Sequence, residues 1–138
     1  MPGKDVDLVV IGAGLSGCAL VAALRKRDWQ GTIQIFEAGR GPGGRCATRR
    51  RRDDSLWRLD HGSPTLSFHA APRGQLLELM TSLQQRGVVR VDDDPVVGLD
   101  HLGNAVEAAE HPLLQGPRWR GVPTMASVAE TLLSDGAE

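Results

Sequence analysis

The feature that most constrains the fold is a glycine-rich turn between a predicted strand and a predicted helix. Residues 6–11 are a short apolar run with β-branched side chains, typical of a buried parallel strand. Residues 15–27 are rich in alanine and leucine and end in three basic residues, which favours a helix with a basic last turn. Between them lie Gly12, Gly14 and Gly17. This spacing allows a tight turn, an uncovered backbone and close packing of the helix on the strand.

A second strand completes the unit. Residues 28–31 interrupt the helical pattern, and residues 32–36 are again rich in β-branched side chains. A strand, a helix and a strand within about thirty residues predict a parallel βαβ unit. We therefore expect an α/β protein with a Rossmann-like dinucleotide-binding fold. The uncharged residues 8–24 could be taken for a signal peptide or a membrane span, but their glycine spacing favours the βαβ unit.

Glu37 adds a second element to the nucleotide signal. The start of a helix offers free backbone N–H groups and a positive dipole end to phosphates. Glu37 ends the second strand, twenty residues after Gly17. An acid at this place can accept hydrogen bonds from both ribose hydroxyls of an adenosine, and it disfavours a ribose 2′-phosphate.

The loop after Glu37 bears on which dinucleotide binds. Residues 39–44 contain four glycines and a proline, and Arg45 follows. Such a loop can bring its backbone close to a ligand and place a cation near a pyrophosphate. NAD-dependent dehydrogenases do not normally have this loop, so it favours FAD. An NAD-binding module remains an alternative.

At this point the sequence resembles a known family. Residues 37–48 resemble the second motif of the flavin amine oxidase superfamily, which includes monoamine oxidases, phytoene desaturases and renalases. The run GRGPGGRCATRR, followed by LDHGS at residues 59–63, is most similar to bacterial renalase-like oxidoreductases. Residues 118–125, RWRGVPTM, are similar to a segment that leads into a helix in the same family. The resemblance is most specific in the first sixty residues.

The resemblance implies a set of cofactor-binding residues. The first glycines would surround the FAD pyrophosphate, Glu37 would bind the adenosine ribose, and Arg40 would contact the adenosine side of the cofactor or its phosphates. Gly44, Arg45 and Thr48 would approach the pyrophosphate and the flavin, and residues 60–62 would lie near the isoalloxazine ring, largely through backbone. The full set is Gly12, Gly14, Leu15, Ser16, Gly17, Glu37, Ala38, Arg40, Gly44, Arg45, Thr48, Asp60, His61 and Gly62.

The resemblance also implies an activity. A small donor, such as a dihydronicotinamide or an amine, would give a hydride to the flavin, and an NAD- or NADP-type dinucleotide could be the substrate. The chain would be a truncated form that holds only the N-terminal part of a longer enzyme. No catalytic residue is assigned, and His61 is expected to be structural. A non-catalytic nucleotide-binding remnant or partner subunit remains open.

The remaining sequence is less informative. Residues 1–70 are expected to form the FAD-binding unit, and residues 71–138 the incomplete rest of that domain and the start of a substrate domain. The expected elements are helices at 75–86 and 123–133 and strands at 57–60, 88–91 and 95–99. Residues 101–117 carry no assignable pattern.

Composition excludes several classes of function. The net charge of −1 over 138 residues gives no argument for nucleic acid. Cys18 and Cys46 lack metal-ligand spacing, so we expect reduced thiols in a cytoplasmic protein without a metal. Residues 49–52, which are all arginine, favour a solvated loop, and the acidic residues 92–94 a turn. Two parallel strands leave open edges, which predicts self-association or a companion segment.

Overall fold

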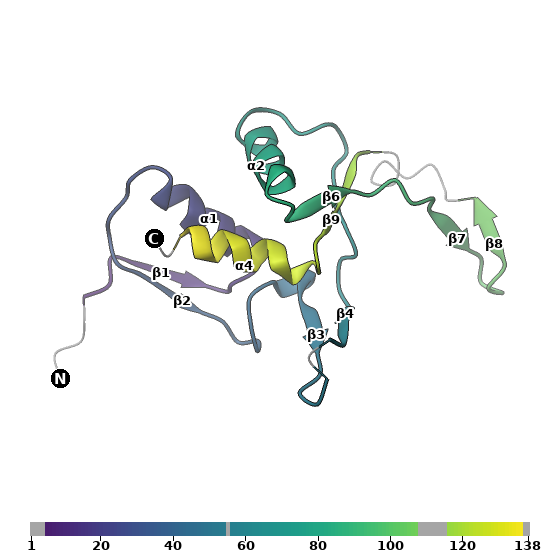
Figure 1. Ribbon diagram of the computed structural model, residues 1–138, viewed down its shortest axis with the longest axis horizontal. Coiled ribbons are helices and arrows are strands. Elements are labelled where there is room, and N and C mark those ends of the chain that lie inside the picture. The colour runs from purple at the N-terminus through teal and green to yellow at the C-terminus, as the bar shows by residue number, and fades with distance from the viewer. Residues whose placement is uncertain (1–4, 55, 108–115, 137–138) are drawn as a thin grey trace. The chain divides into compact units, whose positions relative to one another are not determined.

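The computed structural model describes residues 5–54, 56–107 and 116–136. The chain forms two compact units (Figure 1). The first unit comprises Met1–Pro64 and Gly121–Glu138, and the second comprises Thr65–Arg120. The first unit is thus discontinuous in sequence, while the functional division expected at residue 70 remains a prediction.

The first unit contains the predicted βαβ unit. Strand β1 (Leu8–Ile11) leads into helix α1 (Leu15–Arg25), which is followed by strand β2 (Ile33–Phe36). The two strands pair in parallel, with Val10 opposite Ile35. The uncharged run is therefore divided between a strand and a helix. Within the described ranges, no helix is long and apolar enough to cross a membrane.

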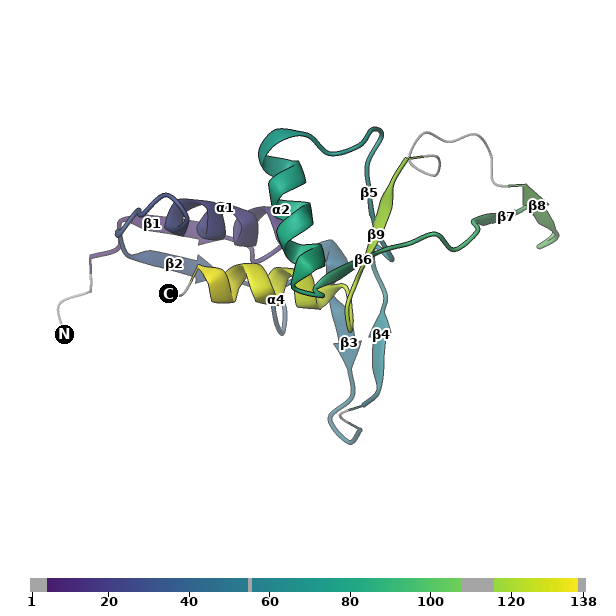
Figure 2. The same ribbon diagram turned by 45° about the horizontal axis from the view of Figure 1, so that its top comes forward.

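A helix from the far end of the sequence completes this unit. Helix α4 (Ala126–Asp135) lies beside α1 in both views (Figures 1 and 2). Val128, Ala129 and Leu132 on α4 are buried, as is Val21 on α1. Periodicity placed this helix at 123–133, but it begins three residues later, where two side chains from another segment cap it.

The loop after β2 leads into a short hairpin. A single 3-10 turn, η1 (Gly44–Cys46), precedes strand β3 (Thr48–Arg50), which pairs antiparallel with strand β4 (Arg58–Asp60). The arginines of residues 49–52 are exposed, as expected. Part of that segment nevertheless forms a strand, because β4 supplies its hydrogen-bonding partner.

The second unit has its own small core. Helix α2 (Gly74–Gln85) matches the predicted helix, and Gly87 ends it with a φ of +71°. The predicted strand that follows is present as β6 (Val89–Val91). Met80, Leu83 and Val89 are nearly fully buried. Met80 and Leu83 of the apolar face that the helical periodicity predicted are thus buried, whereas Leu76 of the same predicted face is 40% exposed.

Three of the four remaining strands of the second unit were not predicted. The further strands of the second unit are β5 (Leu66–Ser67), β7 (Val97–Leu99), β8 (Ala105–Glu107) and β9 (Arg118–Gly121). The order of the larger sheet is β5-β9-β6, and β7 and β8 form an antiparallel hairpin. Of these strands only β7 was predicted, and residues 108–115 of the unassigned stretch lie outside the described residues.

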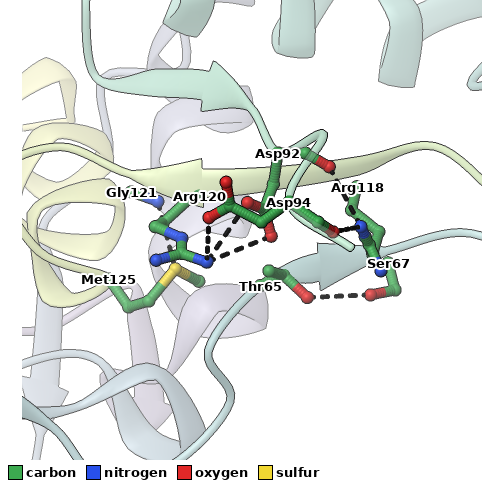
Figure 3. A network of polar contacts seen from close by, with 8 residues as sticks. All are labelled: Thr65, Ser67, Asp92, Asp94, Arg118, Arg120, Gly121 and Met125. Atoms are coloured by element: carbon green, nitrogen blue, oxygen red, sulfur yellow. Dashed lines mark hydrogen bonds and ion pairs between the residues drawn. The ribbon is translucent and has the colours of Figure 1, made fainter. Parts of the chain in front are cut away.

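The acidic residues after β6 are paired with arginines of β9 (Figure 3). One nitrogen of Arg120 lies 3.1 Å from Asp92 Oδ1 and 3.3 Å from Asp94 Oδ2. Arg118 donates to the backbone carbonyls of the same two aspartates. The arginines thus balance the charges of Asp92 and Asp94 without a metal ion. Among the described residues no cluster suited to a metal is present.

Candidate functional site

The first glycine turn, residues 12–17, joins β1 to α1. Gly12 has a φ of +93°, a conformation that side chains disfavour. Gly17 has a different reason to be glycine, because a Cβ there would overlap the carbonyl oxygen of Gly12 and press on Val10. Helix and strand therefore approach each other as closely as the sequence predicted.

Gly14 differs from the other two glycines. Its φ of −71° and ψ of 174° suit any residue, and a Cβ there would meet only the Gly44 Cα, at an ordinary 3.9 Å. Neither the backbone nor the packing of the chain requires glycine here. Helix α1 begins at the next residue, Leu15, without a side-chain cap. The backbone amides at Leu15 and Ser16 thus start a helix beside an uncovered backbone, as an anion site requires.

A second glycine turn, residues 43–46, lies against the first. The Gly43 N–H donates to the Ala13 carbonyl at 2.8 Å. Gly44 has a φ of +54°, and a Cβ there would come within 3.1 Å of the Gly14 Cα. The two segments thus meet backbone to backbone, and we call residues 12–17 and 43–46 the paired turns.

Glu37 points at the first turn. One carboxylate oxygen accepts the Ala13 N–H at 2.7 Å, and the other accepts the Gly39 N–H at 2.6 Å. Both hydrogen bonds lower the pKa of Glu37 below its usual value, and the one from Gly39 has the larger effect. The acid is therefore ionised at neutral pH and lies at the end of β2, where the sequence predicted a ribose ligand.

Two arginines lie in or near the second turn. Arg40 and Arg45 are exposed, and neither has an ion-pair partner within the described parts of the chain. Ala38 is exposed in the same loop. Since both guanidinium groups are free to meet an anion, the loop has the charge that a pyrophosphate site needs.

The predicted residues of the hairpin have other contacts. Thr48 Oγ1 donates to Asp60 Oδ1, and both side chains accept backbone N–H groups at the start of α4. Gly62 packs on the Arg45 carbonyl, which accepts a hydrogen bond from the Ser63 N–H. His61 is exposed. Their expected proximity to a flavin ring remains a prediction.

Two contributors to the site, Ala13 and Cys18, were not predicted. Ala13 acts through its backbone groups, which leave no signal in a side-chain motif. Cys18 is fully buried, and its thiol donates to the Ala13 carbonyl at 3.2 Å. Burial raises the pKa of Cys18 and likewise that of Cys46, so both thiols are neutral.

Comparisons with known proteins agree with this arrangement. The model of the NAD(P)-binding Rossmann-like domain family matches residues 10–83, more than half of the chain. A zeta-carotene-forming phytoene desaturase from Myxococcus xanthus is 42% identical over 52 residues, which are 38% of this chain and 10% of the desaturase. The chain therefore spans only a small part of that relative.

Similar solved structures are also longer than this chain. A CLA-producing fatty acid isomerase from P. acnes shares 19% identity with a TM-score of 0.49, over 82% of this chain and 25% of the isomerase. A redesigned putrescine oxidase shares 23% identity with a TM-score of 0.45, over 75% of this chain and 21% of the oxidase.

The expected α/β class and the parallel βαβ unit are thereby confirmed, and a dinucleotide of the FAD type is consistent with the match. The family match covers the first turn, Glu37 and the second turn, which are the parts that the geometry brings together. Because this match covers more than half of the chain and includes the paired turns, the chain belongs to the NAD(P)-binding Rossmann-like domain family.

Proposed function

We propose that the paired turns bind the pyrophosphate of FAD and that Glu37 binds the adenosine ribose. The chain would then be the FAD-binding portion of a renalase-like or amine oxidase-like oxidoreductase. The amides at the start of α1 and the free guanidinium groups of Arg40 and Arg45 support this assignment, because both attract phosphate.

The observation that carries the proposal is the space at Gly14. Every other glycine of the paired turns is explained by the chain itself, through a positive φ or a close backbone contact. Gly14 is explained by neither. A ligand that lies against this backbone accounts for the missing side chain, and a pyrophosphate at a helix N-terminus fits that description.

The second turn favours FAD over NAD. It places the Gly44 backbone against Gly14, and the exposed Arg45 is the next residue in the turn. A cofactor that extends beyond its pyrophosphate along this turn would meet backbone and a cation. The resemblance of residues 37–48 to flavin amine oxidases supports the same choice.

The chemistry of such a protein would belong to the bound flavin, which accepts a hydride from a small donor. The residues of this chain would bind and orient the cofactor. Glu37, ionised at neutral pH, would accept hydrogen bonds from ribose hydroxyls, and the amides of α1 would donate to phosphate oxygens.

A binding titration tests this function. The purified chain is titrated with FAD, NAD and NADP, and bound FAD is recognised by its absorption near 375 and 450 nm, roughly where oxidised flavins absorb. We expect saturable binding of FAD and weaker binding of both nicotinamide dinucleotides. A chain that binds NAD and ignores FAD would contradict the proposal.

A second experiment separates an enzyme from a binding module. The FAD-loaded chain is mixed without oxygen with a dihydronicotinamide or an amine, and the 450 nm absorption is followed. Bleaching that reverses with oxygen supports an oxidoreductase. Bound FAD that no donor reduces identifies a non-catalytic module.

A further inference from the structure

Thr48 and Asp60 lie opposite each other at the base of the β3–β4 hairpin, and together they cap α4. Thr48 Oγ1 donates to Asp60 Oδ1 at 2.5 Å. The Met125 N–H lies 3.2 Å from both oxygens of Asp60, and the Ala126 N–H lies 3.1 Å from Thr48 Oγ1. The first amides of a helix have no partner within the helix, so these two side chains satisfy them.

The base of this hairpin is continuous with the second glycine turn. Thr48 begins β3 and is separated from η1 by one residue, and Gly62 follows β4. Gly62 lies so close to Arg45 that a Cβ would overlap the Arg45 carbonyl oxygen, and the Ser63 N–H donates to that oxygen at 2.7 Å. Both ends of the hairpin therefore hold residues 43–46 in place.

We infer that Thr48 and Asp60 are positioning residues of the nucleotide site. By fastening the base of the hairpin to α4, they fix the second glycine turn against Gly14. This inference rests on the proposed function, and it changes the role that the resemblance implied for these two residues. They act on the cofactor through the backbone of residues 43–46.

The cap is suited to this task because it joins distant segments of one unit. Asp60 and Met125 are 65 residues apart, and a carboxylate at a helix N-terminus is favoured by the helix dipole. Removing either side chain leaves buried or half-buried amides without partners, which loosens the contact between hairpin and helix. The second turn would then lose its support, while Glu37 and the first turn keep theirs.

Hydrogen exchange on the ligand-free chain tests the anchoring. Thr48→Val keeps the side-chain shape and removes both hydrogen bonds, and Thr48→Ser keeps the hydroxyl. Backbone amides at Gly43, Cys46 and Ala47 are hydrogen-bonded within the paired turns. In Thr48→Val we expect their exchange to rise about tenfold, through more frequent local opening. In Thr48→Ser it stays at the wild-type rate.

Arg50→Gln is the matched control. Arg50 also links the hairpin to α4, through an ion pair with Glu130 at 2.6 Å, but both side chains are largely exposed. Exposed pairs contribute little, so exchange at these amides should not change. Equal exchange in wild type and Thr48→Val, or an equal rise in the control, would overturn the inference.

Binding gives an independent readout. FAD is compared with AMP, which carries the adenosine and one phosphate only, at a temperature where every variant is folded. In Thr48→Val we expect FAD affinity to fall about tenfold and AMP affinity to change less than about twofold, because AMP would bind mainly through Glu37 and the first turn. Asp60→Ala should show the same difference between FAD and AMP, and Asp60→Asn, which keeps one acceptor, replaces it if Asp60→Ala fails to fold.

The outcomes separate the two proposals. Wild-type FAD binding with unchanged affinity in Thr48→Val overturns the positioning role and leaves the proposed function standing. An equal loss for FAD and AMP also overturns it, because the two residues would then serve only the stability of the unit. A wild-type chain that binds no FAD overturns the proposed function and this inference with it.

Discussion

Gly14 and Gly17 lie three residues apart in the first turn, yet the chain needs them for different reasons. At Gly17 a Cβ would overlap backbone, so the fold itself requires glycine. At Gly14 the same atom would meet nothing closer than 3.9 Å. The distinction between a folding glycine and a ligand glycine lies in these distances, which the spacing motif alone does not give.

Gly17→Ala should therefore destabilise the protein. The added methyl group must push α1 away from β1, and overpacking of this kind costs about 1–3 kcal/mol of unfolding free energy. Urea unfolding of the variant and wild type measures the difference. A Gly17→Ala protein as stable as wild type would show that helix and strand are farther apart than described.

Glu37→Ala should weaken FAD binding by roughly ten- to a hundredfold, because charge-assisted ribose hydrogen bonds are lost. Asp53→Ala is the control, since Asp53 is an equally exposed acid that pairs with Arg51 on the hairpin. Titration with FAD measures both. Unchanged affinity in Glu37→Ala would mean that the acid does not bind ribose.

The lowered pKa of Glu37 predicts a pH dependence of stability. Because the folded-state pKa lies below the ordinary value of 4.5, the ionised acid stabilises the fold above about pH 4.5. This contribution is lost as the pH falls through the lowered folded-state pKa. Thermal unfolding of wild type and Glu37→Gln should therefore converge in acid. Curves that stay parallel at every pH would argue against the two backbone hydrogen bonds.

Among single helices and strands, the sequence predicted those whose formation depends on their own residues. The runs before and after the first turn gave β1 and α1, and apolar spacing gave α2. Strand β3 is short and polar and forms because β4 pairs with it, and β5 and β9 pair with each other although they lie far apart in the sequence. No periodicity within such a strand reveals its partner.

The start of α4 shows the same limit. Apolar periodicity alone extends back to residue 123, but the helix begins at Ala126. Its first amides are capped by side chains that lie more than sixty residues earlier in the sequence. The motif residues Thr48 and Asp60 were thus found from the sequence, whereas their contact with α4 could not be.

Helix α2 offers a matched test of its buried face. Leu83 is 2% exposed and Leu77 is 50% exposed, and both lie on the same helix. Leu83→Ala should cost about 2–5 kcal/mol of unfolding free energy, whereas Leu77→Ala should cost less than about 1 kcal/mol. Chemical denaturation measures both variants. Equal losses would mean that α2 packs through a different face.

At the scale of the whole molecule, the β1–β2 sheet has one apolar face that the described chain leaves open. Val9, Ile11 and Phe36 are 50%, 80% and 51% exposed, while Val10 between the first two is buried. Parallel strands are normally covered on both faces. An open apolar face with free strand edges favours association between copies.

The double variant Val9→Thr with Ile11→Thr should therefore reduce self-association. Threonine keeps the β-branched shape that strands favour and makes the face more polar. Val97→Thr, at a 59% exposed position of β7, is the control. Sedimentation across a range of concentrations measures the effect. A wild-type chain that stays monomeric throughout would contradict the prediction.

A pyrophosphate that lies against the backbone of Gly14 leaves no room there for a side chain, so Gly14→Ala should separate folding from cofactor binding. The methyl group meets no closer atom of the chain than Gly44 Cα, so the melting temperature should match that of wild type. It would project into the place assigned to the phosphates, so FAD affinity measured by calorimetry should fall at least about tenfold. A Gly14→Ala protein that melts as wild type and binds FAD equally well would mean that no phosphate lies against Gly14.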